Sequence, residues 1–174
     1  QIAKEMNIKA VQYYKIKNEN DNLCLCKSFI KDDQSEFVNA LQIKNEYNLT
    51  STGLYNWFKK NGFSDNIDNM IGFDYLIRNI DRHERNFGII RNPDSLEIMS
   101  FAPIFDNGTS LLFDGLKNEE TKPFKQNRQQ QLNLVTKNIN IPDFDFIKNI
   151  IIETYQSFNL SIDITSHIIY DIKE

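Results

Sequence analysis

The chain has 174 residues, of which 20 are Lys or Arg and 24 are Asp or Glu, so its formal net charge is −4. This length predicts one domain, or one lobe of a larger one, with a buried core. The mild acidity argues against a nucleic-acid partner, because phosphate binding needs a dense basic surface. No apolar run approaches the ~18 residues of a membrane helix. No signal peptide is visible, and Cys24 and Cys26 are too close for an ordinary disulfide, so we expect a reduced cytoplasmic protein.

The first thirty residues predict the end of a helix followed by a β-hairpin. Apolar residues in 2–6 have helical spacing without a preceding cap, so we take the chain to begin inside a helix of a longer protein. Two strand-like runs, 11–16 and 23–29, flank a turn rich in Asn and Asp, which predicts the hairpin. Leucines alternate with the two cysteines in the second run. This pattern predicts that both faces of the strand are covered and that the cysteines are small core residues.

Three helices are predicted between this hairpin and residue 80. The first begins at Ser35 and includes Phe37 and Val38 in its apolar stripe. The second has an aromatic group that we interpret as packing, and it ends at Gly62. The third begins with a cap at Ser64-Asp65 and has the strongest stripe. Its stripe consists of Ile67, Met70, Ile71, Asp74, Ile77 and Ile80.

A polar segment, 81–86, follows the third helix and leads into a second hairpin. Its strands are predicted at 87–90 and 96–101, joined by an Asn-Pro-Asp-Ser turn. The rest of the chain is predicted to be rich in loops up to about residue 140. Two amphipathic helices are then expected, over 143–158 and 164–173.

Three oxygen-bearing side chains are predicted to meet at the open end of the second hairpin. Asn86 enters its first strand and Asp106 follows its second, while Asp81 is held just before them by the end of the helix. A carboxylate and an amide carbonyl offer the hard oxygen ligands that Mg²⁺ uses with nucleotide phosphates. A carboxylate five residues before the asparagine can accept a proton from an attacking hydroxyl. Together they match the phosphoryl-transfer template of protein kinases.

Each of these residues also has an ordinary structural interpretation. Asp81 or Asn86 alone would suit a helix cap or a turn, and the joint pattern with Asp106 is what favours chemistry. We expect His83 to fix the shape of its loop rather than bind metal, because a lone histidine makes a poor zinc site. For Arg82 and Arg85, contact with phosphate or substrate and simple solvation both stay open.

The segments 81–88, Asp-Arg-His-Glu-Arg-Asn-Phe-Gly, and 102–108, Ala-Pro-Ile-Phe-Asp-Asn-Gly, resemble the catalytic core of the HipA-like serine/threonine kinases. These are the toxin kinases of bacterial toxin–antitoxin systems and their relatives. The family pattern is Asp-x-His-x-x-Asn-Phe, then Pro-hydrophobic-aromatic-Asp, and every position is filled here. The His-Arg that precedes the aspartate in most protein kinases is absent. Residues 26–29 resemble, more weakly, the hinge between kinase lobes.

The resemblance implies a role for each residue of the site. Asp81, His83 and Asn86 would be the catalytic residues, with Asp81 as the base, and Asn86 and Asp106 would hold Mg²⁺. The segment from Lys27 to Phe29 would contact ATP through its backbone, next to the metal at Asp106.

The implied fold is α+β and protein-kinase-like, with a hinge β-hairpin followed by a mostly α-helical C-terminal lobe that carries a small catalytic β-hairpin. Residues 1–30 would be a remnant of the N-lobe and hinge, and 31–174 the helical C-lobe. A Gly-rich loop, a strand lysine and its partner glutamate are not found, and Glu5 is not a candidate for that glutamate. The nucleotide clamp of the N-lobe is thus missing, and this isolated portion is expected to be inactive.

The implied activity is ATP- and Mg²⁺-dependent phosphoryl transfer to a serine or threonine of a protein substrate, and an antitoxin partner is implied by the family alone. Two alternatives stay open. Lipid kinases of the phosphoinositide type have a similar loop, so a lipid or small-molecule alcohol is a second acceptor class, which the lack of a basic membrane-facing stretch disfavours. The third reading is a catalytically silent pseudokinase or binding module.

Overall fold

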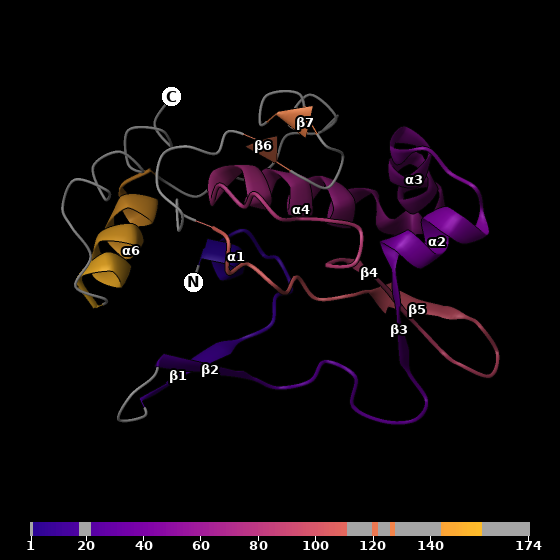
Figure 1. The fold of residues 1–174 in the computed structure, drawn as a ribbon, viewed down its shortest axis with the longest axis horizontal. Helices are drawn as coiled ribbons and strands as arrows, with labels where there is room; N and C mark the ends of the chain where they lie inside the picture. The colour runs from indigo at the N-terminus through magenta and orange to yellow at the C-terminus, as the bar shows by residue number, and fades with distance from the viewer. Residues whose placement is uncertain (1, 18–21, 111–119, 122–125, 128–143, 158–174) are drawn as a thin grey trace.

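The structure is a computed structural model that describes residues 2–17, 22–110, 120–121, 126–127 and 144–157 (Figure 1). Its helices are α1 (Ile2–Glu5), α2 (Ala40–Glu46), α3 (Ser51–Phe58), α4 (Ser64–Leu76) and α6 (Phe144–Ser157), with a π-helical turn η1 (Lys59–Phe63). Its strands are β1 (Tyr13–Lys17), β2 (Asn22–Cys26), β3 (Glu36–Asn39), β4 (Gly88–Arg91), β5 (Ile98–Phe101), β6 (Glu120–Thr121) and β7 (Gln126–Asn127). Within these ranges, no helix combines the length and apolarity needed to span a membrane.

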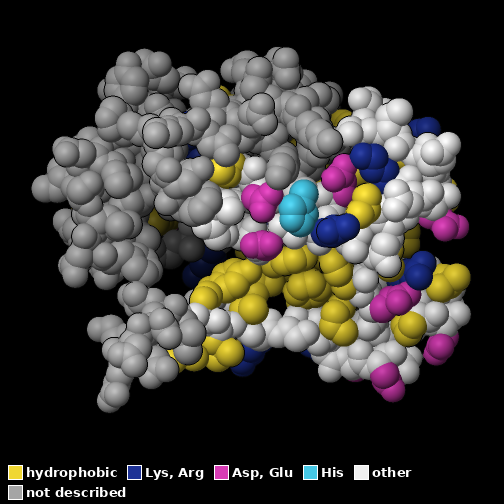
Figure 2. Space-filling view, viewed as in Figure 1, with side chains coloured by type: hydrophobic (Ala, Val, Ile, Leu, Met, Phe, Trp, Pro, Cys, Tyr) yellow, Lys and Arg dark blue, Asp and Glu magenta, His cyan; other side chains and the backbone are white. Residues whose placement is uncertain are grey.

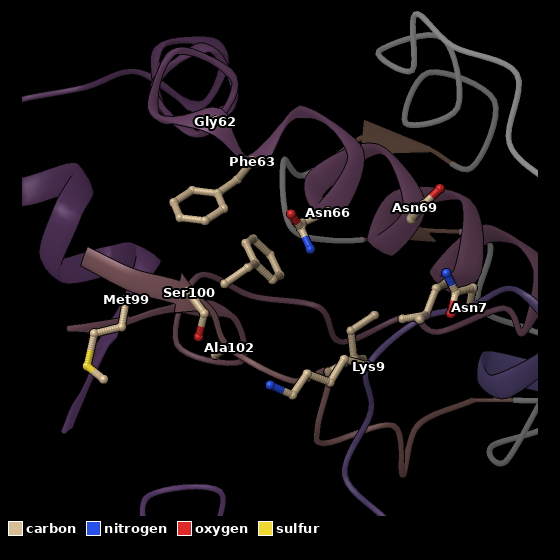
Figure 3. A pocket seen from close by; sticks show the side chains of 12 residues that line it. Asn7, Lys9, Gly62, Phe63, Asn66, Asn69, Met99, Ser100 and Ala102 are labelled. Atoms are coloured by element: carbon tan, nitrogen blue, oxygen red, sulfur yellow. The ribbon is translucent and has the colours of Figure 1, made fainter.

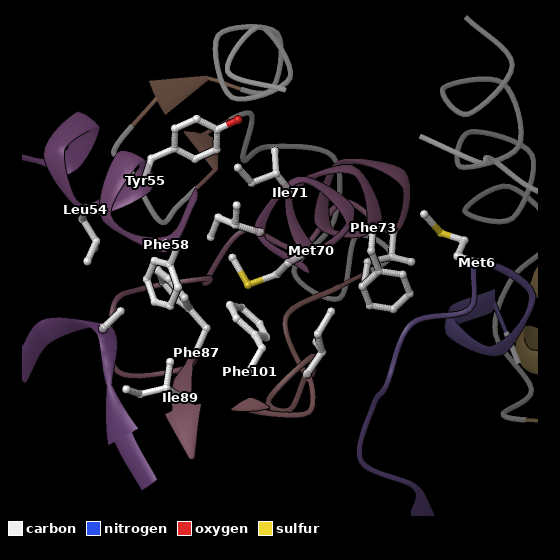
Figure 4. Packing of buried hydrophobic residues seen from close by; sticks show 14 of the residues in the cluster. Met6, Leu54, Tyr55, Phe58, Met70, Ile71, Phe73, Phe87, Ile89 and Phe101 are labelled. Atoms are coloured by element: carbon white, nitrogen blue, oxygen red, sulfur yellow. The ribbon is translucent and has the colours of Figure 1, made fainter. Parts of the chain in front are cut away.

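A three-stranded antiparallel sheet in the order β3-β4-β5 forms one side of the core. Val38 pairs with Ile89, and Ile89 pairs with Phe101, so these side chains share one face of the sheet. That face packs on α3 and α4 (Figure 4), where the ring of Phe58 lies 5.6 Å from Phe87 and 5.5 Å from Phe101, measured between centroids. The β4–β5 hairpin, which carries the candidate site, is therefore held in place by β3 and by packing on α3 and α4.

Residues 36–39 form strand β3, so the helix predicted from Ser35 is wrong in its first part. Phe37 pairs with Ile90 of β4, and α2 begins only at Ala40. Asn39 caps α2 in a capping box with Gln42. The apolar spacing around Phe37 suited a helix, but a partner strand distant in sequence satisfies this backbone instead, and local spacing does not reveal such a partner.

The helix end predicted at Gly62 is confirmed, whereas the predicted cap of the next helix is not. Gly62 has a φ of +87°, the left-handed conformation expected at the end of a helix, and Asn61 before it is also non-helical, so the chain is kinked inside η1. In α4, Ser64 is already helical, and the N-cap, Phe63, makes no side-chain cap bond. The predicted Ser64-Asp65 cap is therefore wrong. Helix α4 ends at Leu76, so Ile80 of the predicted stripe lies beyond it.

The N-terminal hairpin is confirmed as β1 and β2, which pair antiparallel with Tyr13 opposite Cys26. Its predicted burial is wrong, because Cys24 and Cys26 are exposed and Leu25 on the other face is 54% exposed. Figure 1 shows the hairpin extending away from the sheet and from α4, which agrees with this exposure. Helix α6 matches the prediction for 143–158, and the helix predicted over 164–173 lies outside the described residues.

Candidate active site

Asn86 and Asp106, predicted to meet at the open end of the β4–β5 hairpin, are in direct contact. The Nδ2 of Asn86 donates to Oδ2 of Asp106 at 2.8 Å. The same nitrogen donates to the backbone carbonyl of Asp81 at 3.3 Å. Asn86 is buried, whereas Asp106 is exposed at the surface. The structure thus brings together the side chains of Asn86 and Asp106 and the backbone of Asp81.

Short-range hydrogen bonds fold the loop between Asp81 and Asn86 into a tight turn. The N–H of His83 donates to the carbonyl of Asp81 at 2.8 Å, and the N–H of Asn86 donates to the carbonyl of His83 at 2.9 Å. The Nδ1 of His83 accepts from the N–H of Arg85 at 3.3 Å. The imidazole therefore bonds its own loop, as expected for a residue that fixes the loop's shape.

Arg82 is completely buried and holds this loop against helix α4. Its Nε and Nη2 donate to the two carboxylate oxygens of Asp74, at 2.9 and 3.1 Å. Its Nη1 donates to the backbone carbonyls of Asn86, at 2.9 Å, and Phe105, at 2.6 Å. Nη2 also donates to the side-chain oxygen of Asn107. One planar guanidinium with several donors thereby connects both halves of the site to one helix.

The sequence left two interpretations of Arg82 open, solvation and contact with phosphate or substrate, and neither is correct. The overlooked signal was Asp74, a carboxylate within the apolar stripe of α4. A charge at a core-facing position requires a buried partner of opposite sign, since an unpaired buried charge is very costly. Arg82 is that partner.

Asn79 extends the buried network to the other side of the loop, and sequence reasoning did not select it. Its Nδ2 donates to Oδ1 of Asp74 at 3.0 Å. Its Oδ1 accepts from the N–H of Asp81 at 3.1 Å and from the hydroxyl of Thr109 at 3.0 Å. The position of Asp81 in the backbone is therefore set by the same network that holds the segment around Asp106.

The N-terminal hairpin reaches the site through Tyr13. The hydroxyl of Tyr13 accepts a hydrogen bond from the N–H of Asp106 at 2.9 Å. Partial burial raises the pKa of Tyr13, and the nearby Cys26, Asp106 and Cys24 raise it further, while the bond from Asp106 opposes the shift. Asp106 itself has a φ of +55°, in the left-handed region that Asp and Asn adopt more readily than most residues.

A cluster of three aromatic rings connects the hinge segment to the residue before Asp106. Phe29 lies 5.5 Å from Phe37 and 5.4 Å from Phe105, and Phe37 lies 5.5 Å from Phe105, between ring centroids. Figure 2 shows acidic side chains and a histidine on the same face, next to a band of hydrophobic side chains. Of the predicted nucleotide contacts, Phe29 is therefore beside the site, while Lys27 is exposed two residues earlier.

The Asn86–Asp106 pair fits the ligand chemistry of Mg²⁺. An amide oxygen and a carboxylate oxygen are hard ligands of the kind that Mg²⁺ prefers, and the hydrogen bond of 2.8 Å shows that these two side chains meet. A half-turn of the amide puts its oxygen where its nitrogen now lies. No group of three His, Cys, Asp or Glu side chains suited to a metal occurs in the described ranges. Magnesium that arrives with phosphates needs only one or two protein ligands.

Comparison with known proteins identifies a fold and no family. No family model matches this chain, and no curated protein matches it. Among solved structures, the crystal structure of the Helicobacter pylori proinflammatory kinase CtkA is similar, with a TM-score of 0.67 and 18% sequence identity. The similarity covers 98% of this chain and 77% of that chain. The predicted kinase-like fold is thereby confirmed, and the division into two lobes at residue 30 stays a prediction.

Proposed function

We propose that this chain is the base- and metal-bearing part of a HipA-like serine/threonine protein kinase, which transfers the γ-phosphoryl group of ATP to a protein hydroxyl with Mg²⁺. The main support is the 2.8 Å contact between Asn86 and Asp106 next to Asp81, on a kinase-like fold. The motif around these residues, quoted above, supports the narrower family assignment.

In this mechanism Asn86 and Asp106 would hold the metal ion, which when bound would supply positive charge against the phosphates of ATP. Asp81 orients the acceptor hydroxyl and accepts its proton as the hydroxyl oxygen bonds to the γ-phosphorus. The bond from that phosphorus to the bridging oxygen breaks, and ADP leaves. No covalent intermediate on the protein is needed, so catalysis rests on positioning and electrostatics.

The buried network supports this positioning role. Asn79 fixes the N–H of Asp81, and Arg82 fixes the carbonyl of Asn86 and that of Phe105, the residue before Asp106. The proposed base and both proposed metal ligands are thus tied to α4 through their backbones. Such preorganisation lowers the reorganisation required during the reaction.

The proposed nucleotide contact is the hinge segment together with the cluster of three aromatic rings. The backbone from Lys27 to Phe29 would contact adenine, and the packing of Phe29 on Phe105 ties that segment to the chain next to Asp106. A protein substrate is proposed as the acceptor, and an antitoxin as a partner, both on the resemblance to the HipA-like kinases.

The test is phosphoryl transfer from radiolabelled ATP by the full-length protein, with protein and lipid acceptors offered side by side. We expect protein labelling, and a loss of roughly 10²–10⁴-fold in Asp81→Asn, typical of a lost general base. Asp106→Asn should lose at least as much, because it removes the metal-binding carboxylate. Asp94→Asn, an exposed residue in the turn between β4 and β5, is the matched control.

Full activity in either site variant would overturn the assignment. Labelling of the lipid alone would identify the second acceptor class. Absence of both labelling and nucleotide binding in the full-length protein would favour a catalytically silent binding module.

A further inference from the structure

A cavity lies along the outer edge of β5, separate from the contact between Asn86 and Asp106. It has a volume of about 360 Å³ and is bounded by β5, by the N-terminal half of α4 and by the segment 7–9 (Figure 3). We call it the β5-edge cavity. None of the residues that line it belongs to the proposed catalytic machinery.

The wall formed by β5 presents backbone groups of an edge strand. β5 is the last strand in the order β3-β4-β5, so only one of its edges is paired among the described residues. The N–H of Ala102 donates to Gly88 of β4 at 2.9 Å, and Ser100 pairs with Ile90. In an antiparallel strand the backbone N–H and C=O groups of successive residues point alternately to the two edges. Those of Ser100 and Ala102 point to β4, so those of Phe101 point away from it. Phe101 lines the cavity.

The same edge is already extended by another segment a few residues further along the chain. Ala10 and Ile104 form a parallel bridge, in which Ile104 donates to the carbonyl of Lys9 and accepts from the N–H of Val11, both at 2.8 Å. An extended peptide is therefore accepted next to this edge in the structure itself. The cavity is the neighbouring stretch, where no described segment fills that position.

Polar side chains line the cavity without being used elsewhere in the described part of the chain. Asn66 and Asn69 come from α4 and Asn7 from the N-terminal segment, and none of their side chains bonds another described residue. An asparagine amide has two donors and an acceptor, which suits the N–H and C=O groups of an extended peptide. Figure 3 shows Asn66 and Phe63 on one side and Ser100 and Ala102 on the other.

Lys9 supplies the charge preference of the site. Among the described residues that line the cavity it is the one with a charge, and Figure 3 shows its amino group extending toward β5. The other described lining residues are neutral, with the ring of Phe63 6.0 Å from that of Phe101. A single ammonium group in a neutral cavity favours a carboxylate or phosphate over a cation.

We propose that the β5-edge cavity binds an extended, acidic peptide segment of a partner protein. The main chain of the segment pairs with Phe101 and with the amides of Asn66 and Asn69, and its acidic side chain meets Lys9. The proposal does not depend on phosphoryl transfer. It does place a bound segment near the candidate site, since four residues from Ala102 to Asp106 span at most about 14 Å.

The probes are two pools of fluorescein-labelled octapeptides of degenerate sequence, which differ only in one fixed residue, Asp or Lys. Each pool is titrated with the full chain, and binding is measured by fluorescence anisotropy. We expect the Asp pool to bind roughly threefold more tightly, because Lys9 is exposed and an ion pair that solvent reaches is weak. Lys9→Glu should reverse this preference. Combined Asn66→Ala and Asn69→Ala should weaken binding of both pools by about fivefold or more, from the lost hydrogen bonds.

Controls separate this site from general charge effects and from catalysis. Lys31→Glu makes the same charge change at an exposed residue outside the cavity and should leave the preference for the Asp pool intact. A pool with N-methylated backbone next to the Asp should bind at least fivefold less tightly, since it cannot donate to Phe101. Asp106→Asn should bind the Asp pool normally even where phosphoryl transfer is lost.

Equal binding of the Asp and Lys pools, or unchanged preference in Lys9→Glu with an unchanged melting curve, would overturn the proposal. So would equal binding of the N-methylated pool, which would exclude pairing to the strand. Dimerisation of the chain that is abolished by Lys9→Glu would assign the edge to a second copy instead, and would also overturn it.

Discussion

The two sides of the candidate site are built in opposite ways. On one side, the loop from Asp81 to Asn86 is held by a buried network in which Arg82, Asp74 and Asn79 satisfy one another. On the other side, the β1–β2 hairpin is exposed on both faces. Within the described residues it reaches the site through the hydroxyl of Tyr13, and the segment that follows it packs there through the ring of Phe29.

The rigid loop side suits the proposed phosphoryl transfer, and the loosely held hairpin side suits the proposed binding of a nucleotide. Ligands and a base that act on phosphate need fixed positions, and a buried, satisfied network provides them. The hairpin, on the side proposed to bind the nucleotide, can be held by few contacts, because loosely packed regions open at low free-energy cost. We therefore expect substitutions on the loop side to change global stability strongly, and substitutions on the hairpin to change it little.

The largest effect is expected from Arg82→Leu. It leaves the Asp74 carboxylate buried without its counter-charge, since both side chains are fully buried, and should lower the free energy of unfolding by about 3–5 kcal/mol. Urea denaturation followed by circular dichroism measures the change. Arg85→Leu, an exposed arginine in the same loop, is the matched control and should stay within about 0.5 kcal/mol. Equal effects of the two variants would show that the buried Arg82–Asp74 ion pair does not stabilise the loop.

Gly88→Ala should come next, because this glycine lies where two strands approach closely. An added Cβ would lie 2.1 Å from the carbonyl oxygen of Val38 and 2.8 Å from the Cα of Asn39, so β3 and β4 must move apart. We expect a loss of about 1–3 kcal/mol, measured by the same denaturation. At Gly108 an added Cβ meets no described atom within 4 Å, so Gly108→Ala is the control. A stable Gly88→Ala protein would show that the sheet adjusts freely.

Much of this arrangement follows from sequence because the information is local. Asn86 and Asp106 flank a hairpin whose turn is fixed by Asn92, with Oδ1 accepting from the N–H groups of Asp94 and Ser95, both at 2.9 Å. A short hairpin returns the chain to its starting point, so residues at its open end must meet. The contact between Asn86 and Asp106 was predictable for this reason.

What the sequence did not predict depends on partners distant in the chain. Phe37 became part of a strand because β4 lies beside it, and Arg82 is buried because Asp74 faces it from another element. Burial is equally non-local, so the cysteines of β2 had a core-like pattern although nothing described covers them. A carboxylate in an apolar stripe was the one local sign of such a partner, and it was available at Asp74.

A smaller effect is expected where the loop meets α2. The Nζ of Lys44 lies 2.8 Å from Oε1 of Glu84, and both side chains are partly exposed, at 26% and 20%. Pairs that solvent reaches contribute about 0–1 kcal/mol, so Glu84→Gln should cost less than 1 kcal/mol. Raising the salt concentration should shrink the difference between wild type and variant. A cost that matched the Arg82→Leu effect would move the main support of the loop from α4 to α2.

The smallest effect is expected on the hairpin side, and it should depend on pH. Because the pKa of Tyr13 is raised in the folded state, its neutral phenol stabilises the fold below the ordinary tyrosine value of about 10. That contribution is lost as the pH rises through the folded pKa, because the unfolded chain releases its proton first. Urea unfolding between about pH 9 and pH 11 should therefore show a smaller decline for Tyr13→Phe than for wild type. Tyr14→Phe, on the opposite face of β1, should follow the wild-type decline. A Tyr13→Phe curve parallel to the wild-type curve would mean that folding does not raise the pKa of Tyr13.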